Sequence, residues 1–109
     1  MSSLIFHGDT LYLPKHFTKI IHEVELGVLI SMPGRDIPKE KAHEHIGGYF
    51  LAIDFTNRDL GPMFKKDGAP WCLQKGSDGF TAVSDILPVD MVGNCQELDL
   101  DLRINGESK

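Results

Sequence analysis

The sequence has few cysteines, no long apolar run and no basic stripe, and each absence excludes a class of protein. Only two cysteines, Cys72 and Cys95, occur in 109 residues, and their spacing is not that of a zinc site. The longest apolar stretches fall far short of the roughly 20 residues that a membrane-spanning helix needs. The net charge of −5 argues against binding to a nucleic-acid backbone.

The first residues and the thiols bear on where the protein works. Residues 1–9 (MSSLIFHGD) lack the basic start and the long apolar core of a signal peptide. We therefore expect a cytoplasmic or mitochondrial protein that is not secreted and whose cysteines stay reduced. Cys72 stands beside Trp71, and we interpret it as a packing residue rather than a nucleophile.

The composition is that of a globular protein with a modest core. Apolar residues make up 41% and charged residues 25% of the chain. We expect an irregular segment over residues 1–19, with Leu11–Leu13 as a candidate short strand, and a mixed, mainly β domain over residues 20–109. Apolar alternation and the glycine and proline breaks, among them Gly47-Gly48, predict strands at 20–32 and 49–56 and short outer helices at 38–46 and 58–66.

The clearest alternation of apolar and charged residues lies near the end of the chain. Residues 97–104 (ELDLDLRI) place Leu and Ile on one face and charged residues on the other, which predicts a third strand. Asn105-Gly106 is a strong hairpin signal, yet only three residues follow it. Because a strand without its return partner leaves a sheet edge open, we expect a homodimer or other self-association.

Three acidic residues stand in otherwise apolar strands. Glu23 and Glu25 are one residue apart in HEVELGVLIS, so both side chains point to the same face. Asp54 is a lone acid in YFLAIDFT, on the face opposite Tyr49 and Leu51. If the two strands are neighbours, three carboxylates converge, and an all-oxygen ligand set suits Mg²⁺ or Mn²⁺, or Ca²⁺.

Each of these residues also has an interpretation without a metal. Glu23 and Glu25 together are typical of a solvated strand face, and Asp54 could form a structural ion pair with Arg58. Lys75, between Gln74 and Gly76, could be a solvated loop lysine. A structural β domain without any metal is therefore one of the alternatives.

Three stretches resemble one enzyme family in order and spacing. They are IIHEVELGVLI, IGGYFLAIDFTNRD and FKKDGAPWCLQKGSDGFTAVSDILP, which together span most of residues 20–88. The chain is similar to the fumarylacetoacetate hydrolase family, in particular to its small acylpyruvase and oxaloacetate decarboxylase branch. That resemblance implies the family's β-roll or sandwich-like core with short peripheral helices.

The resemblance also implies roles for individual residues. Glu23, Glu25 and Asp54 match the family's three ligands of a divalent cation, usually Mg²⁺ or Mn²⁺. Arg58 matches the arginine after the aspartate strand, and Lys75 matches the lysine that reaches the substrate. Substrates of the family are short keto acids, so a small keto acid is the expected partner.

The chain departs from the family pattern in three places. Residues 1–19 contain no glycine-arginine-asparagine-tyrosine segment with a following histidine and glutamate, the pair that activates water in the family. The glycine-threonine-proline-glycine loop of the family's second half is not in the chain, so we expect an incomplete catalytic domain. Gly61 stands where the family often has glutamine after "RDL".

Two interpretations of function follow from these patterns. The first is a member or fragment of a metal-dependent enzyme that cleaves carbon–carbon bonds of short keto acids, by acylpyruvate hydrolysis, oxaloacetate decarboxylation or both. The second is a catalytically silent fragment that only binds a metal or a partner subunit. Decarboxylation needs less machinery than hydrolysis, because no water has to be deprotonated.

Overall fold

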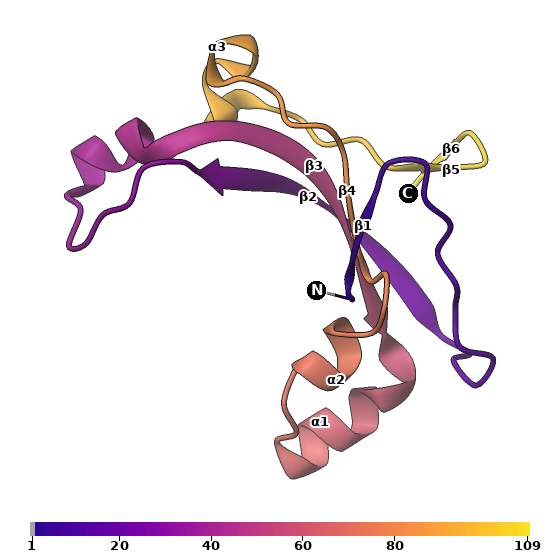
Figure 1. Cartoon of the computed structure of the whole chain (residues 1–109). Helices are drawn as coiled ribbons and strands as arrows, with labels where there is room; N and C mark the ends of the chain where they lie inside the picture. The colour runs from indigo at the N-terminus through magenta and orange to yellow at the C-terminus, as the bar shows by residue number, and fades with distance from the viewer. Residues whose placement is uncertain (1) are drawn as a thin grey trace.

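The computed structural model describes residues 2–109 as a curved four-stranded sheet, a separate two-stranded hairpin and short helices (Figure 1). The expected mixed, mainly β fold with short peripheral helices is confirmed. The elements in chain order are β1 (Leu4–Phe6), β2 (Ile20–Ile30), η1 (Lys39–His45), β3 (Ile46–Asn57), η2 (Arg58–Leu60), α1 (Gly61–Asp67), α2 (Cys72–Lys75), β4 (Thr81–Val83), α3 (Val89–Val92), η3 (Cys95–Glu97), β5 (Arg103–Ile104) and β6 (Glu107–Ser108). In the part of the chain that the structure describes, no helix combines the length and apolar character that crossing a membrane requires.

The long antiparallel pair of β2 and β3 is the framework of the sheet. The four-stranded sheet has the order β1-β4-β3-β2, with β1 parallel to β4 and the other pairs antiparallel. In the β2–β3 register Glu23 lies opposite Asp54, and Gly27 lies opposite Phe50. A β-carbon on Gly27 would meet the Phe50 ring at 2.2 Å, so only glycine lets this ring lie across the strand.

A small core lies where β3 and β4 meet the segment that precedes β2. Phe80 is fully buried there. Ala52 and Tyr49 are buried farther along β3, where they lie opposite Val83 and Leu87. The Phe80 ring packs edge-on against Phe17 at a centroid distance of 6.0 Å and lies tilted against Phe55 at 6.1 Å. These contacts hold the ends of β3 and β4 together and so position the helices that follow β3.

Several predicted elements need correction. The first segment is not irregular throughout, because Leu4–Phe6 forms β1; Leu11–Leu13 forms no strand. The first helix is an exposed 3-10 helix over Lys39–His45, and Gly47 and Gly48 belong to β3 rather than to a break before it. A three-residue strand such as β1 carries too little alternation to be read from sequence.

The predicted strand over residues 97–104 is wrong for most of its length. Cys95–Glu97 forms a 3-10 turn, Leu98 and Leu100 are both 42% exposed, and strand pairing begins only at Arg103. The hairpin signal is correct: Asn105 and Gly106 both have positive φ, 52° and 86°, and join β5 to β6. Alternation indicates which side chains share a face, but a strand also needs a neighbour for its backbone.

A polar clamp joins the start of β2 to the end of β3. Asp59 accepts hydrogen bonds from the Thr18 backbone N–H at 2.6 Å, the Thr18 hydroxyl at 2.6 Å and the Lys19 N–H at 3.2 Å. The Arg58 N–H donates to the Lys19 carbonyl at 2.8 Å. The clamp therefore fixes the backbone of Arg58 beside β2.

Replacing Asp59 with asparagine is expected to remove part of the acid sensitivity of folding. The Thr18 hydroxyl, followed by the Thr18 N–H, lowers the pKa of Asp59 below its usual 3.8. A pKa lowered in the folded state stabilises the protein above the unfolded-state pKa, and this contribution is lost as the pH falls through the folded-state pKa, below about 4. The unfolding free energy of the wild type should therefore fall more steeply between about pH 5 and pH 3 than that of Asp59→Asn.

Urea unfolding at a series of pH values measures this difference. Asp90→Asn is the matched control, because Asp90 is an exposed aspartate on α3 outside the clamp. Its pH dependence should follow the wild type. Parallel slopes for the wild type and Asp59→Asn would show that the clamp does not depend on the Asp59 charge.

Candidate metal centre

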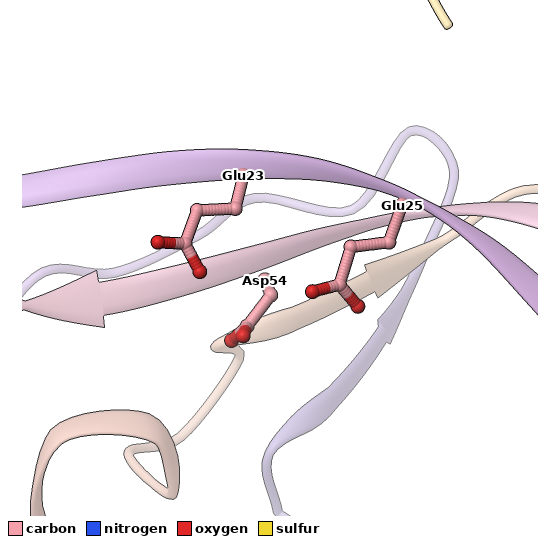
Figure 2. A group of neighbouring side chains, drawn as sticks. All are labelled: Glu23, Glu25 and Asp54. Carbon is pink, nitrogen blue, oxygen red and sulfur yellow. The ribbon is translucent and has the colours of Figure 1, made fainter.

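Three carboxylates gather on one face of the β2–β3 pair. Glu23, Glu25 and Asp54 each offer an oxygen, and these three atoms lie within 4.8 Å of one another. Figure 2 shows Glu23 and Glu25 extending from β2 toward Asp54 on β3. The period of two puts both glutamates on one face, and the register of Glu23 with Asp54 brings the third acid opposite them.

Lys75 reaches the same cluster from α2. The α2 helix packs against β3, and Lys75 is its last residue, with its N–H bonded to the Trp71 carbonyl at 3.2 Å. The Lys75 Nζ donates to Glu23 Oε2 at 2.6 Å and also to Asp54 Oδ2. Its side chain is only 29% exposed, so Lys75 is not the solvated loop lysine of the alternative interpretation.

Arg58 pairs with Glu23 and not with Asp54. Its Nη2 lies 3.3 Å from Glu23 Oε1, while the second Glu23 oxygen accepts a longer hydrogen bond from the Thr56 hydroxyl at 3.4 Å. The alternative of a structural Asp54–Arg58 pair is therefore wrong. The clamp at Asp59 explains the outcome, because it holds the Arg58 backbone against the start of β2.

The charges of the cluster do not balance. Lys75 and Arg58 contribute two positive charges against three carboxylates, and both contact Glu23, whereas Asp54 pairs with Lys75. Glu25 is exposed and lies in the cluster without an ion pair among residues 2–109. The cluster thus carries one negative charge more than its own cations neutralise.

The pKa shifts follow these contacts. The hydrogen bond from Lys75 lowers the pKa of Glu23, burial opposes this shift, and the Lys75 and Arg58 charges reinforce it. Burial disfavours the charged form of Lys75, but its hydrogen bonds to Asp54 and Glu23 outweigh that cost and raise its pKa. At neutral pH Glu23 is therefore ionised and Lys75 protonated.

The donor set fits a hard divalent cation. Three carboxylate oxygens on neighbouring strands and the absence of sulfur or imidazole from the group are typical of Mg²⁺, Mn²⁺ or Ca²⁺ sites. The uncompensated negative charge favours the same class of ligand. The structure brings the three predicted ligands together, and their role as ligands stays a prediction, as do the roles of Arg58 and Lys75.

Two residues considered in the sequence analysis lie outside the cluster, and one residue that contacts the cluster was not predicted. His22 pairs with Phe55 in the register and so faces away from Glu23, as expected for alternate positions on a strand. Cys72 is a free, exposed thiol, so its interpretation as a packing residue is wrong. Sequence reasoning missed Thr56, two residues beyond Asp54 on the same strand face, although this spacing could have indicated it.

The whole chain, residues 1–109, matches the family described as "Fumarylacetoacetate (FAA) hydrolase C-terminal". An oxaloacetate tautomerase, mitochondrial, from Arabidopsis thaliana is 40% identical over 108 residues, covering 99% of this chain and 48% of the relative. An oxaloacetate decarboxylase, mitochondrial, from Dictyostelium discoideum is 35% identical, covering 99% of this chain and 50% of the relative. The chain thus spans about half the length of the curated relatives it matches.

Solved structures of the same family resemble the fold of this chain. Fumarylpyruvate hydrolase from Pseudomonas aeruginosa, in complex with Mn²⁺ and pyruvate, superposes with a TM-score of 0.85 at 32% identity, covering 98% of this chain and 48% of that one. The 5-carboxymethyl-2-hydroxymuconate delta-isomerase of Mycobacterium smegmatis superposes with a TM-score of 0.71 at 31% identity, covering 82% and 34%. The match along the entire chain, the shared fold and the three expected sequence stretches lead to one conclusion: the chain belongs to the fumarylacetoacetate hydrolase family.

Proposed function

We propose that the chain carries the metal-binding half of a keto-acid site and that its chemistry is the decarboxylation of oxaloacetate. The observation that carries the proposal is the group of three carboxylate oxygens within 4.8 Å of one another, with the Lys75 ammonium beside them. Glu23, Glu25 and Asp54 would hold the cation. When bound, the cation supplies a Lewis acid that polarises the keto-acid carbonyl.

The side chains around the cation site suit the charge changes of this reaction. In decarboxylation the bond between C3 and the C4 carboxylate breaks, CO₂ leaves, and the electron pair forms the enolate of pyruvate. A proton from water then completes pyruvate. Lys75 places a positive charge in a half-buried site, where it offsets negative charge more strongly than in open water.

Hydrolysis of an acylpyruvate makes a further demand. It needs a water molecule that is deprotonated by a positioned base, and such assistance is typically worth about 10²–10⁴ in rate. Among residues 2–109, the cluster of three carboxylates contains no histidine, and His22 faces away from it. The described residues therefore support decarboxylation better than hydrolysis.

The relatives support the substrate class and suggest a second activity. One relative is named an oxaloacetate decarboxylase, and another, at 40% identity, an oxaloacetate tautomerase. Tautomerisation moves a proton between C3 and the keto oxygen and leaves every carbon–carbon bond intact. Both reactions develop enolate charge at the same keto group, so the same cation and ammonium serve either one. Because both relatives are named as mitochondrial, we also propose a mitochondrial location.

Excess Mn²⁺ is expected to raise the melting temperature of the chain through the carboxylate cluster. A ligand that binds only the native state stabilises it by about 2.7 kcal/mol at 100 times its Kd. Glu25→Gln is the informative variant, because Glu25 forms no ion pair among the described residues and its loss should cost little without metal. Its melting temperature in a chelator should match the wild type or exceed it, and most of the Mn²⁺ gain should disappear.

Differential scanning fluorimetry with EDTA, Mg²⁺ or Mn²⁺ measures these shifts. Glu40→Gln is the matched control, since Glu40 is an exposed glutamate on η1, away from the cluster. It should keep the full gain. A wild type whose melting temperature does not respond to excess Mn²⁺ would refute the metal site.

Lys75→Met should lower the melting temperature in EDTA and increase the rise in melting temperature that Mn²⁺ causes. In EDTA the variant leaves Glu23 and Asp54 close together without their shared cation. Because these pairs are partly exposed, the cost should be about 1 kcal/mol, or about 4–8 °C for a domain of this size. With saturating Mn²⁺ the gain in melting temperature should exceed that of the wild type, since the metal no longer competes with an ammonium. An equal or smaller gain would show that Lys75 does not compete for the site.

A parallel assay of two substrates tests the reaction itself. With Mn²⁺ we expect weak conversion of oxaloacetate to pyruvate and CO₂, lost in Asp54→Ala and Lys75→Met, and acetylpyruvate hydrolysis near background. Enol absorbance, followed in the same samples, separates tautomerisation from carbon–carbon cleavage. Robust acetylpyruvate hydrolysis would contradict the preference for decarboxylation, and metal binding without turnover of oxaloacetate would favour the silent fragment.

A further inference from the structure

Glu23 is held by more donors than the exposed ligand candidate beside it. Its Oε1 accepts a hydrogen bond from Arg58 at 3.3 Å, and its Oε2 accepts one from Lys75 at 2.6 Å and one from the Thr56 hydroxyl at 3.4 Å. Glu25 is exposed and forms no ion pair within residues 2–109. The fold therefore fixes the orientation of Glu23, while Glu25 is free to adapt.

The three donors to Glu23 differ in how firmly they are fixed. Arg58 and Lys75 have long side chains that are 45% and 29% exposed. Thr56 is only 1% exposed, and a β-branched side chain has few rotamers, so its hydroxyl has an almost fixed position. Lys75 also contacts Asp54 and so competes with a cation for the carboxylate oxygens, whereas the Thr56 hydroxyl contacts Glu23. Thr56 is thus the donor that need not move when a cation binds.

Thr56 meets Glu23 because of the strand register. Thr56 lies opposite Ile21 and two residues beyond Asp54, so it shares the face of the carboxylates and is the diagonal neighbour of Glu23. Valine would suit a buried strand position of this shape and would not bury a hydroxyl. The bond to Glu23, rather than packing, therefore accounts for the hydroxyl at this position.

Divalent cations differ in how strictly they require an oriented ligand. Mg²⁺ requires a near-ideal octahedron of oxygens at about 2.0–2.1 Å, whereas Ca²⁺ accepts flexible arrangements at about 2.3–2.6 Å. A carboxylate that turns freely can still serve Ca²⁺, but it serves Mg²⁺ poorly. A fixed Glu23 therefore favours the smaller cation.

We propose that Thr56 is a positioning residue that holds Glu23 in its ligand orientation and thereby shifts the preference of the carboxylate cluster from Ca²⁺ toward Mg²⁺. This role rests on the proposed function, because it requires a cation at the cluster. Side chains that orient a metal ligand without touching the metal typically contribute a factor of about 10–100 in metal affinity. The selectivity of the cluster is thus assigned to a residue that is not itself a ligand.

Two substitutions separate the hydroxyl of Thr56 from its shape. Thr56→Val keeps the shape and removes the hydroxyl, whereas Thr56→Ser keeps the hydroxyl and removes a methyl group. Thr10→Val is the matched control, because Thr10 is exposed in the segment after β1, outside the cluster. Isothermal titration of the metal-free proteins with MgCl₂ and with CaCl₂ gives the Kd of each cation.

Thr56→Val should weaken Mg²⁺ binding about tenfold, because Glu23 then turns more freely. Ca²⁺ binding should weaken clearly less, so the ratio of the two affinities shifts toward Ca²⁺. Thr56→Ser should restore most of the wild-type ratio. Thr10→Val should leave both Kd values unchanged.

Thermal melting in EDTA separates positioning from a structural role. Glu23 keeps Lys75 and Arg58 as donors in Thr56→Val, so the melting temperature should stay near the wild-type value. A marked drop would show that the hydroxyl is structural and would overturn the role of Thr56. Equal weakening of both cations, no change in either, or a Thr56→Ser that behaves like Thr56→Val would also overturn it. A wild type that binds neither cation would overturn the proposed metal site, and the role of Thr56 with it.

Discussion

The ammonium of Lys75, lodged between Glu23 and Asp54, is the interaction on which the rest of the site depends. It joins a four-residue helix to the two longest strands of the sheet and lowers the repulsion among three carboxylates. A helix as short as α2 has little stability of its own, so its position relies on tertiary contacts of this kind.

Alternation in the sequence predicted β2 and most of β3, because both strands are long enough for the repeat of two residues to show. It also placed Glu23 and Glu25 on one face. The meeting of Glu23 with Asp54 depended on the register, which the sequence alone did not determine. The spacing connected the three acids only on the condition that the two strands are neighbours, and the family resemblance then implied a role for each.

The remaining features depended on contacts between distant residues. Lys75 contacts Glu23 across 52 positions, and such a contact depends on how α1 and α2 fold back on β3. Arg58 pairs with Glu23 rather than with Asp54, because the hydrogen bonds between Asp59 and Thr18 fix the backbone next to Arg58. The strand expected over residues 97–104 failed for a related reason: its alternation was real, but no long partner strand lies beside it in the described part of the chain.

The sheet is unevenly supported along its length. Near Glu23 and Asp54 it has the clamp, α2 and the aromatic contacts of Phe80, whereas Ile30 at the far end of β2 is 62% exposed. Local opening is easiest where few buried contacts resist it, so hydrogen exchange should be slowest beside the carboxylates.

The position of Lys75 bears on how the proposed metal site would behave while no ion is bound. The Lys75 ammonium already neutralises part of the carboxylate charge, so the two strands need no metal ion to keep their geometry. Loss of a metal would then leave a folded protein whose ligands are still in position. Reloading would exchange one positive charge for another and would not require the site to be rebuilt.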